Sequence, residues 1–127
     1  MSFVAFVAAL AVAEYTVIMI LTGRARGTYG VQAPATTGHP IFERHFRVQQ
    51  NTVEQLVIFL PSLLLSAHFF SPRLAGLLGL VFIVGRAMYA RGYVADPGQR
   101  GSGFAVSVAA NVLLVITALL GTLWAAL

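Results

Sequence analysis

The chain has 127 residues, of which 58% are hydrophobic and only 9% are charged, and this composition excludes an ordinary soluble domain and is typical of an integral membrane protein. The formal net charge is +4, and the basic residues are all arginines that lie among apolar segments, so nucleic-acid binding is not expected. There is no cysteine, which excludes disulfides and a cysteine nucleophile, and the three histidines lack metal-ligand spacing, so no metal site is predicted.

Four apolar segments are long enough to cross a bilayer as helices, which takes roughly 20 residues each. In chain order they are Ser2 to Thr22, Ile41 to Phe70, Pro72 to Tyr93 and Gly103 to Leu127. The first lacks a basic n-region, so we expect a retained membrane helix rather than a cleaved signal. The sequence thus predicts an all-α integral membrane protein, with one domain over residues 1–127 and four antiparallel transmembrane helices.

The connections between these segments set the expected orientation in the membrane. GRARGTYGVQAPATTGHP joins the first two segments, a tight break at Ser71 separates the second from the third, and ARGYVADPGQRGSG precedes the fourth. The first and third connections lie on one side of an antiparallel bundle, and they or their flanks hold every arginine except Arg73. The positive-inside rule places that side in the cytoplasm and both termini outside.

Polar residues recur at helical spacing at this same end of the second and third segments. Arg44, Arg47, Asn51 and Glu54 are separated by three, four and three positions, which places them within an arc of about 80°. In the third segment the same spacing relates three further residues, which are Arg86, Tyr89 and Tyr93, and Arg100 follows in the adjoining connection. Any one of these side chains is explained by contact between helices or by snorkelling to headgroups. Because ionisable groups at membrane depth need a partner or water, the whole set favours a shared polar pocket.

The residue types in this pocket indicate the kind of ligand that it would hold. Arginines bind carboxylates through paired hydrogen bonds, and a carboxylate such as Glu54 would hold an ammonium group. The pocket therefore suits a small zwitterion with more negative than positive groups, and glutathione fits this description. Glutathione also brings the thiol that the chain lacks, and a neighbouring arginine would stabilise the reactive thiolate.

Two blocks of sequence resemble the MAPEG family, the membrane-associated proteins in eicosanoid and glutathione metabolism. FERHFRVQQNTVEQLVIFL, residues 42–60, is similar to the signature of the family's second helix, and GRAMYARGYVADPGQR, residues 85–100, is similar to the third helix and the following loop. The stretch PATTGHP also resembles the family's first loop. Together these similarities span most of the chain.

The resemblance implies a homotrimer of four-helix subunits that binds glutathione as co-substrate between adjacent subunits, at the cytoplasmic end and without a metal. It assigns glutathione contacts to the residues Arg47, Asn51, Glu54, Arg86, Tyr89 and Tyr93, with Arg26 and Gln49 reaching in from the neighbouring subunit. Arg100 would activate the thiol. The implied activities are detoxifying glutathione transfer to lipophilic electrophiles and reduction of lipid hydroperoxides. The acceptor would enter sideways from the membrane lipid.

Two departures from the family's pattern leave alternatives open. Gln55 stands where the conjugating members commonly carry a tyrosine, and Gly27 follows Arg26 where a second arginine is common. One alternative is a non-catalytic protein of the same family that binds and presents lipids, and a weaker one is a small transporter. The presence of Arg100 favours the enzyme. Glu14, within the first segment, fits a protonated or hydrogen-bonded structural group that faces the bundle better than a proton relay.

Overall fold

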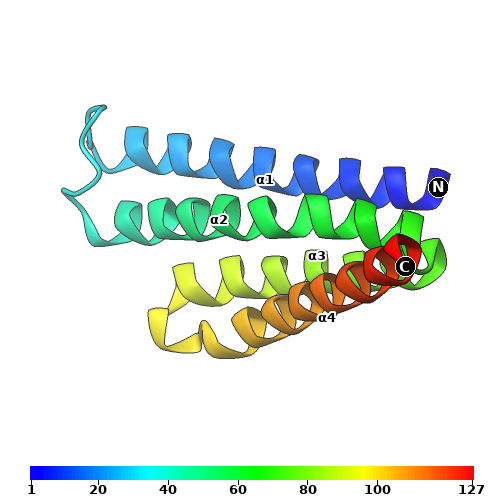
Figure 1. Cartoon of the computed structure of the whole chain (residues 1–127). Coiled ribbons are helices and arrows are strands. Elements are labelled where there is room, and N and C mark those ends of the chain that lie inside the picture. Colours follow the sequence, from blue (N-terminus) through cyan, green and yellow to red (C-terminus); the bar gives the residue numbers. More distant parts are fainter.

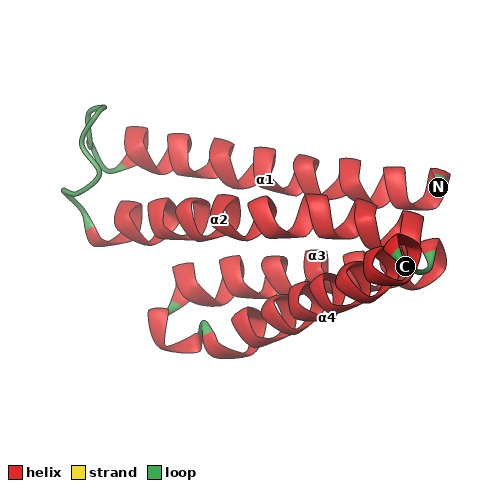
Figure 2. Cartoon of the chain, viewed as in Figure 1, coloured by secondary structure: helices red, strands yellow, loops and turns green.

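The computed structural model describes residues 1–127 as four long helices joined by short connections (Figures 1 and 2). They are α1 (Ser2–Thr28), α2 (Pro40–Phe69), α3 (Pro72–Ala95) and α4 (Gly101–Ala126), with a single 3₁₀ turn, η1 (Pro97–Gln99), before α4. All four helices are long and apolar enough to cross a membrane. The predicted all-α bundle of four transmembrane helices is therefore confirmed.

The helices run alternately up and down, so that the chain termini lie together at one end of the bundle (Figure 1). The α2–α3 turn lies at that same end, whereas the α1–α2 loop and the α3–α4 turn lie at the other (Figure 1). This arrangement agrees with the expected grouping of the two arginine-bearing connections. We call their end the loop end of the bundle.

Three helix boundaries differ from the prediction by two or more residues. The first helix does not stop at Thr22 but continues to Thr28, because Ala25 and Arg26 are good helix formers and the Tyr29 N–H still donates to the Ala25 carbonyl, 2.9 Å away. The last helix begins at Gly101, two residues earlier than expected, since η1 turns the chain directly into it. The third is the end of α3, at Ala95 rather than Tyr93, and the other boundaries lie within one residue of those predicted.

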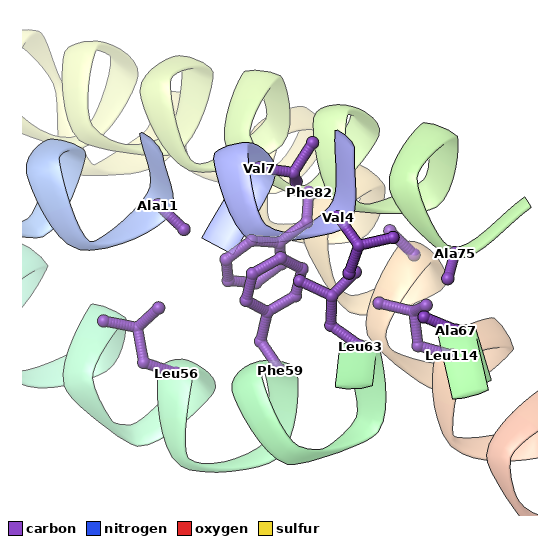
Figure 3. Packing of buried hydrophobic residues seen from close by; sticks show 11 residues of the cluster. Val4, Val7, Ala11, Leu56, Phe59, Leu63, Ala67, Ala75, Phe82 and Leu114 are labelled. Carbon is purple, nitrogen blue, oxygen red and sulfur yellow. The ribbon is translucent and has the colours of Figure 1, made fainter. Parts of the chain in front are cut away.

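A cluster of apolar side chains joins the helices towards the end of the bundle where the chain termini lie, which we call the terminal end (Figure 3). Phe59 of α2 and Phe82 of α3 stack at its centre, with ring centroids 4.0 Å apart, and both are fully buried. Gly79 of α3 lets the side chain of Val7 in α1 lie directly against the helix, where a β-carbon would collide with it. Close packing of this kind, rather than escape from water, holds helices together inside a bilayer.

Polar side chains add contacts between helices at two further levels. Ser66 of α2 and Thr117 of α4 share a hydrogen bond of 2.7 Å within the buried interface. Asn111 of α4 donates to the side-chain oxygen of Gln55 in α2, 2.9 Å away. These bonds pair the buried hydroxyls and the Asn111 amide nitrogen across helix interfaces, while Asn111 Oδ1 is buried without a partner.

Candidate functional site

A polar pocket of about 420 Å³ opens at the loop end of the bundle, between α2, α3 and the start of α4. Its lining consists of Arg47 and Asn51 from α2, Tyr89 and Tyr93 from α3, and Arg100, Gly101 and Phe104 around the first turn of α4. Five of these residues were predicted to contact a common ligand. The two polar faces recognised in the sequence therefore meet in a single cavity.

Arg86 lies behind this pocket and is fully enclosed by protein. Its guanidinium donates to Asn51 Oδ1 and Thr52 Oγ1 on α2, both 2.8 Å away, and to Ser107 Oγ on α4, at 3.3 Å. The same group lies 4.3 Å from the centre of the Tyr89 ring. One side chain of α3 thus ties together the three helices that form the pocket.

The contacts of Arg86 fix two lining residues from behind. Asn51 is 7% exposed, and its side-chain oxygen is held by the guanidinium, so its amide nitrogen is the part left for a ligand. The Tyr89 ring is held between Arg86 and its aromatic neighbours Tyr93 and Phe104, at centroid distances of 5.6 and 6.1 Å. A pocket whose walls are already ordered loses less entropy when a ligand binds.

No carboxylate forms an ion pair with Arg86. Its hydrogen-bond partners are neutral, and its Nε atom is buried without any partner. Glu14 of α1, the acidic side chain of the first helix, lies beyond ion-pair distance of Arg86. The positive charge behind the pocket is therefore only partly compensated, which favours anionic ligands in front of it.

Arg100 reaches the pocket through the turn between α3 and α4. Asp96 holds this turn by accepting a hydrogen bond of 3.0 Å from the Gly98 N–H, and Arg100 is the residue at the N-terminal cap of α4. Gly103, one turn into α4, lies against the backbone of Tyr89 so closely that a β-carbon would collide with it. The exposed Arg100 side chain and the positive end of α4 consequently face the same cavity.

Four predicted site residues do not line the pocket within one chain. Arg86 lies behind it, and Glu54 is exposed beside it, with a carboxylate oxygen 3.9 Å from Arg47. Arg26 instead donates to the Ala35 carbonyl at 2.7 Å, and half-buried Gln49 makes no hydrogen bond through its side chain. Arg26 and Gln49 were expected to reach the pocket of a neighbouring subunit rather than that of their own. Their contribution to a neighbouring pocket stays a prediction.

Arg44 has a different role from its neighbours on the polar face of α2. Its guanidinium donates to the carbonyls of Val94 and Ala95, at 3.1 and 3.4 Å, which lie in the last turn of α3. Cations are favourable at this position because the helix terminus carries partial negative charge and unpaired carbonyls. Arg44 therefore stabilises the end of α3 rather than lining the cavity.

Sequence patterns did not identify the groups that hold Arg86. Thr52 and Ser107 were not singled out as site residues, yet both accept hydrogen bonds from it. Phe104 was also missed, although it stands one helical turn after Arg100 and so shares its face. That spacing was available in the sequence, whereas the positions of Thr52 and Ser107 depend on how the three helices rotate against one another.

The pocket combines two exposed guanidinium groups, two phenols and an amide within a volume suited to a small molecule. Arginine forks recognise carboxylates, and a guanidinium beside a thiol favours its thiolate. No cluster of three His, Asp or Glu side chains able to hold a metal ion occurs in the chain. The arrangement can therefore bind a small anion and stabilise a negative charge that develops upon it.

Comparison with known proteins identifies relatives along nearly the whole chain. The chain is 48% identical over 120 residues to an uncharacterized protein of Synechocystis sp., and the match covers 94% of this chain and 88% of that protein. It is 39% identical over 117 residues to microsomal glutathione S-transferase 2 of Homo sapiens, covering 92% and 80% of the two chains. With leukotriene C4 synthase of Bos taurus it shares 40% identity over 99 residues, 78% of this chain and 66% of the relative. Residues 4–120 match the profile of the MAPEG family, and the chain, an integral membrane protein with several spans, belongs to that family.

Proposed function

We propose that the protein is a membrane-bound glutathione transferase that activates the glutathione thiol for attack on lipophilic electrophiles. The observation that carries the proposal is the convergence of Arg47, Asn51, Tyr89, Tyr93 and Arg100 on one polar cavity at the loop end of the bundle. Glutathione S-transferase and leukotriene C4 synthase among the relatives support glutathione as the co-substrate.

We expect complementary groups in and beside the pocket to hold glutathione. Arg47 would bind a carboxylate, and Glu54, 3.9 Å from Arg47, would hold the ammonium group of the same residue of the peptide. The Asn51 amide nitrogen would donate to a backbone carbonyl of glutathione, and the phenol oxygens of Tyr89 and Tyr93 would bond to its remaining polar groups. Direct contact of Arg86 with glutathione remains a prediction, and its contacts support a role in ordering Asn51.

Arg100 is the proposed catalytic residue. Lowering a thiol pKa from about 8.5 to about 6.5 requires about 2.7 kcal/mol of differential stabilisation. A guanidinium about 4 Å from the sulfur supplies roughly 4 kcal/mol at an effective dielectric constant of about 20. A single well-placed arginine is therefore sufficient, and the start of α4 adds its dipole in the same direction.

The proposed chemistry is attack of the thiolate on the electrophile, by nucleophilic substitution or by addition. In substitution the sulfur electron pair forms a carbon–sulfur bond, and the leaving group departs with its own bonding pair. In addition the same carbon–sulfur bond forms while a bond of the acceptor opens, and the resulting anion takes a proton. With a hydroperoxide, the sulfur attacks the terminal oxygen, the O–O bond breaks and the alkoxide takes a proton. A second glutathione then displaces water from the resulting sulfenic acid and gives the disulfide.

The proposal includes the assembly and orientation of the protein. Three copies would form a trimer in which Arg26 and Gln49 of one subunit complete the pocket of the next. The excess of arginine at the loop end supports a cytoplasmic position for the pocket, where glutathione is available. Lipophilic acceptors would approach from the bilayer along the exposed apolar faces of α1 and α4.

Turnover of the purified protein in detergent tests the proposal directly. Wild-type protein is mixed with glutathione and either chlorodinitrobenzene or cumene hydroperoxide, and conjugate or disulfide is measured. We expect turnover that is lost in Arg100→Ala and kept in Arg24→Ala, which removes an exposed arginine outside the pocket. Absence of both reactions in the wild type, with fatty-acid binding intact, would instead support the non-catalytic alternative.

A further inference from the structure

A second cavity, of about 470 Å³, lies between α1 and α3 with α2 as its floor. On α3 it is lined by Ala87, Ala90 and Val94, which at 100° per residue lie on a different face from Tyr89 and Tyr93. Eight of its eleven lining residues are hydrophobic. This groove is therefore separate from the polar pocket, and its lining is mainly apolar.

Small side chains on α3 leave this space empty. Near the terminal end of the bundle, α1 and α3 are in tight contact, where Val7 lies against Gly79. Towards the loop end, α3 presents Ala87 and Ala90 instead of long side chains that would fill the gap to α1. The opposite wall consists of branched side chains of α1, among them Val17 and Leu21, which are 55% and 40% exposed.

Polar groups stand only at the two ends of the groove. Arg91 and His45 line it at the loop end, and Glu14 lines it at the deep end. His45 lies at the height of Thr22 on α1, because Thr22 Oγ1 donates a hydrogen bond of 3.2 Å to the His45 carbonyl. Glu14 lies eight positions before Thr22 and is therefore about 12 Å deeper, at 1.5 Å per residue.

Arg91 is the group that is free to bind a ligand. Its guanidinium makes no hydrogen bond and no ion pair within the chain. Neighbouring Arg44, by contrast, is occupied by the carbonyls of Val94 and Ala95. Snorkelling alone would direct Arg91 to the headgroups and away from the bundle, whereas its side chain forms part of the groove wall.

We propose that this groove binds a single-chain anionic amphiphile, such as a long-chain fatty acid, with its head at Arg91 and His45 and its chain against α1 and α3. An apolar channel with cationic groups at the interfacial end only is complementary to an anionic head on an apolar tail. The proposal stands apart from the glutathione chemistry, because the groove shares no lining residue with the polar pocket.

One chain fits the groove better than the two chains of a membrane phospholipid. The tight contact of α1 with α3 at Gly79 closes the deep end, and the distance between the polar ends is only about 12 Å. Glu14 adds a hydrogen-bonding group at that depth. A chain that carries a hydroxyl near its middle would match both ends, whereas a plain chain matches only the head.

Photo-crosslinking in phosphatidylcholine nanodiscs tests this site. A diazirine-bearing fatty acid is bound to the full-length protein, irradiated, and its attachment points are mapped by peptide mass spectrometry. We expect labelling concentrated at the α1 and α3 walls of the groove, displaced by palmitate but not by hexadecanol or hexadecylamine. Labelling spread evenly over lipid-facing residues overturns the proposal. Equal labelling of the groove by a diazirine phosphatidylcholine overturns it as well. So does an absence of labelling in the groove because a second copy of the chain covers it.

Matched variants separate the groove from general lipid contact. Ala87→Leu with Ala90→Leu fills it from exposed and half-buried positions and should reduce labelling at least tenfold, while Ala109→Leu on α4 should leave it unchanged. Arg91→Gln should weaken fatty-acid competition about tenfold, as expected for one charged hydrogen bond, while Arg73→Gln at the other end of α3 should not. Unchanged labelling in the groove variants would contradict the assignment even if all the proteins conjugate glutathione normally.

Competition with a hydroxylated fatty acid tests the deep end. Ricinoleate, with its hydroxyl near the middle of the chain, should compete about twofold to tenfold better than oleate. That advantage should vanish in Glu14→Leu. Equal competition by the two acids in the wild type overturns the role of Glu14 in the site.

Discussion

Replacing Arg86 tests whether one buried guanidinium organises the candidate site. Arg86→Met keeps the length of the side chain but removes its charge and three hydrogen bonds, to Asn51, Thr52 and Ser107. Thr52 and Ser107 keep bonds to the carbonyls of Val48 and Phe104, so Asn51 alone loses the partner of its side-chain oxygen. Arg86→Lys instead keeps a buried charge but cannot reach all three groups.

These differences set the expected magnitudes. The methionine variant leaves one buried acceptor unpaired, which costs about 1–3 kcal/mol, and the relief from burying a charge offsets the lost hydrogen bonds. The lysine variant retains the cost of a buried charge without most of its partners, for which about 3–5 kcal/mol is typical. We therefore expect Arg86→Lys, the chemically conservative change, to be the more destabilising of the two.

The assay is reversible unfolding of purified protein in mixed micelles, with helix content followed as dodecyl sulfate increases. Arg73→Met and Arg73→Lys, at an exposed arginine on the same helix, serve as controls and should change the free energy of unfolding by no more than about 0.5 kcal/mol. If Arg86→Lys is as stable as the wild type, the buried network does not hold the three helices as described.

Three further changes test the pocket and its assembly. Glu54→Gln should raise the KM for glutathione about tenfold to a hundredfold in steady-state kinetics, because it removes the charge proposed to bind the ammonium group. The free energy of unfolding should not change, because the pair of Glu54 with Arg47 is exposed. An unaltered KM would show that no ammonium group binds there. Gly103→Ala should lower the free energy of unfolding by about 1–3 kcal/mol in the same micelle assay, since the added β-carbon meets the Tyr89 backbone. Gly101→Ala is the control, because the space around Gly101 is open. Equal effects of the two changes would contradict the close packing at Gly103. Co-expression of Arg26→Ala with Arg100→Ala subunits should restore part of the activity that each variant lacks alone, because mixed trimers contain some intact pockets, and no recovery would exclude sites shared between subunits.

The sequence predicts the architecture well because lipid leaves few choices. The apolar segments had to be helices, and the second and third had to turn back at Ser71, where the hydroxyl caps α3 by accepting a bond from the Leu74 N–H. The exact helix ends were harder to predict, since the extension of α1 past Thr22 depends on local propensity in an arginine-containing stretch that looks like a loop.

The candidate site was only partly accessible from the sequence. Helical spacing was enough to place Arg47, Asn51, Tyr89 and Tyr93 on faces that meet, and the structure brings them together. Spacing could not distinguish an arginine that lines the pocket from one that supports it, and Arg86 proves to be buried. That distinction depends on the rotation of each helix about its axis, which is set by packing contacts such as Gly103 against Tyr89.

The groove between α1 and α3 left no motif in the sequence. It exists because alanines on α3 face α1 at a level where the helices are no longer in tight contact. Alanine in a membrane helix is ordinarily a packing residue, so composition alone predicts a filled interface there. Only the relative placement of the two helices reveals a space.

The central claim is that Arg100 stabilises the thiolate of bound glutathione, and the ultraviolet absorbance of that thiolate as a function of pH tests it most directly. With saturating glutathione, the wild type and Arg24→Ala should show a midpoint near pH 6.5, well below the value of about 8.5 for a free thiol. The Arg100→Ala midpoint should return to about 8.5 while glutathione still binds. Coincident titration curves for the wild type and Arg100→Ala would contradict the account.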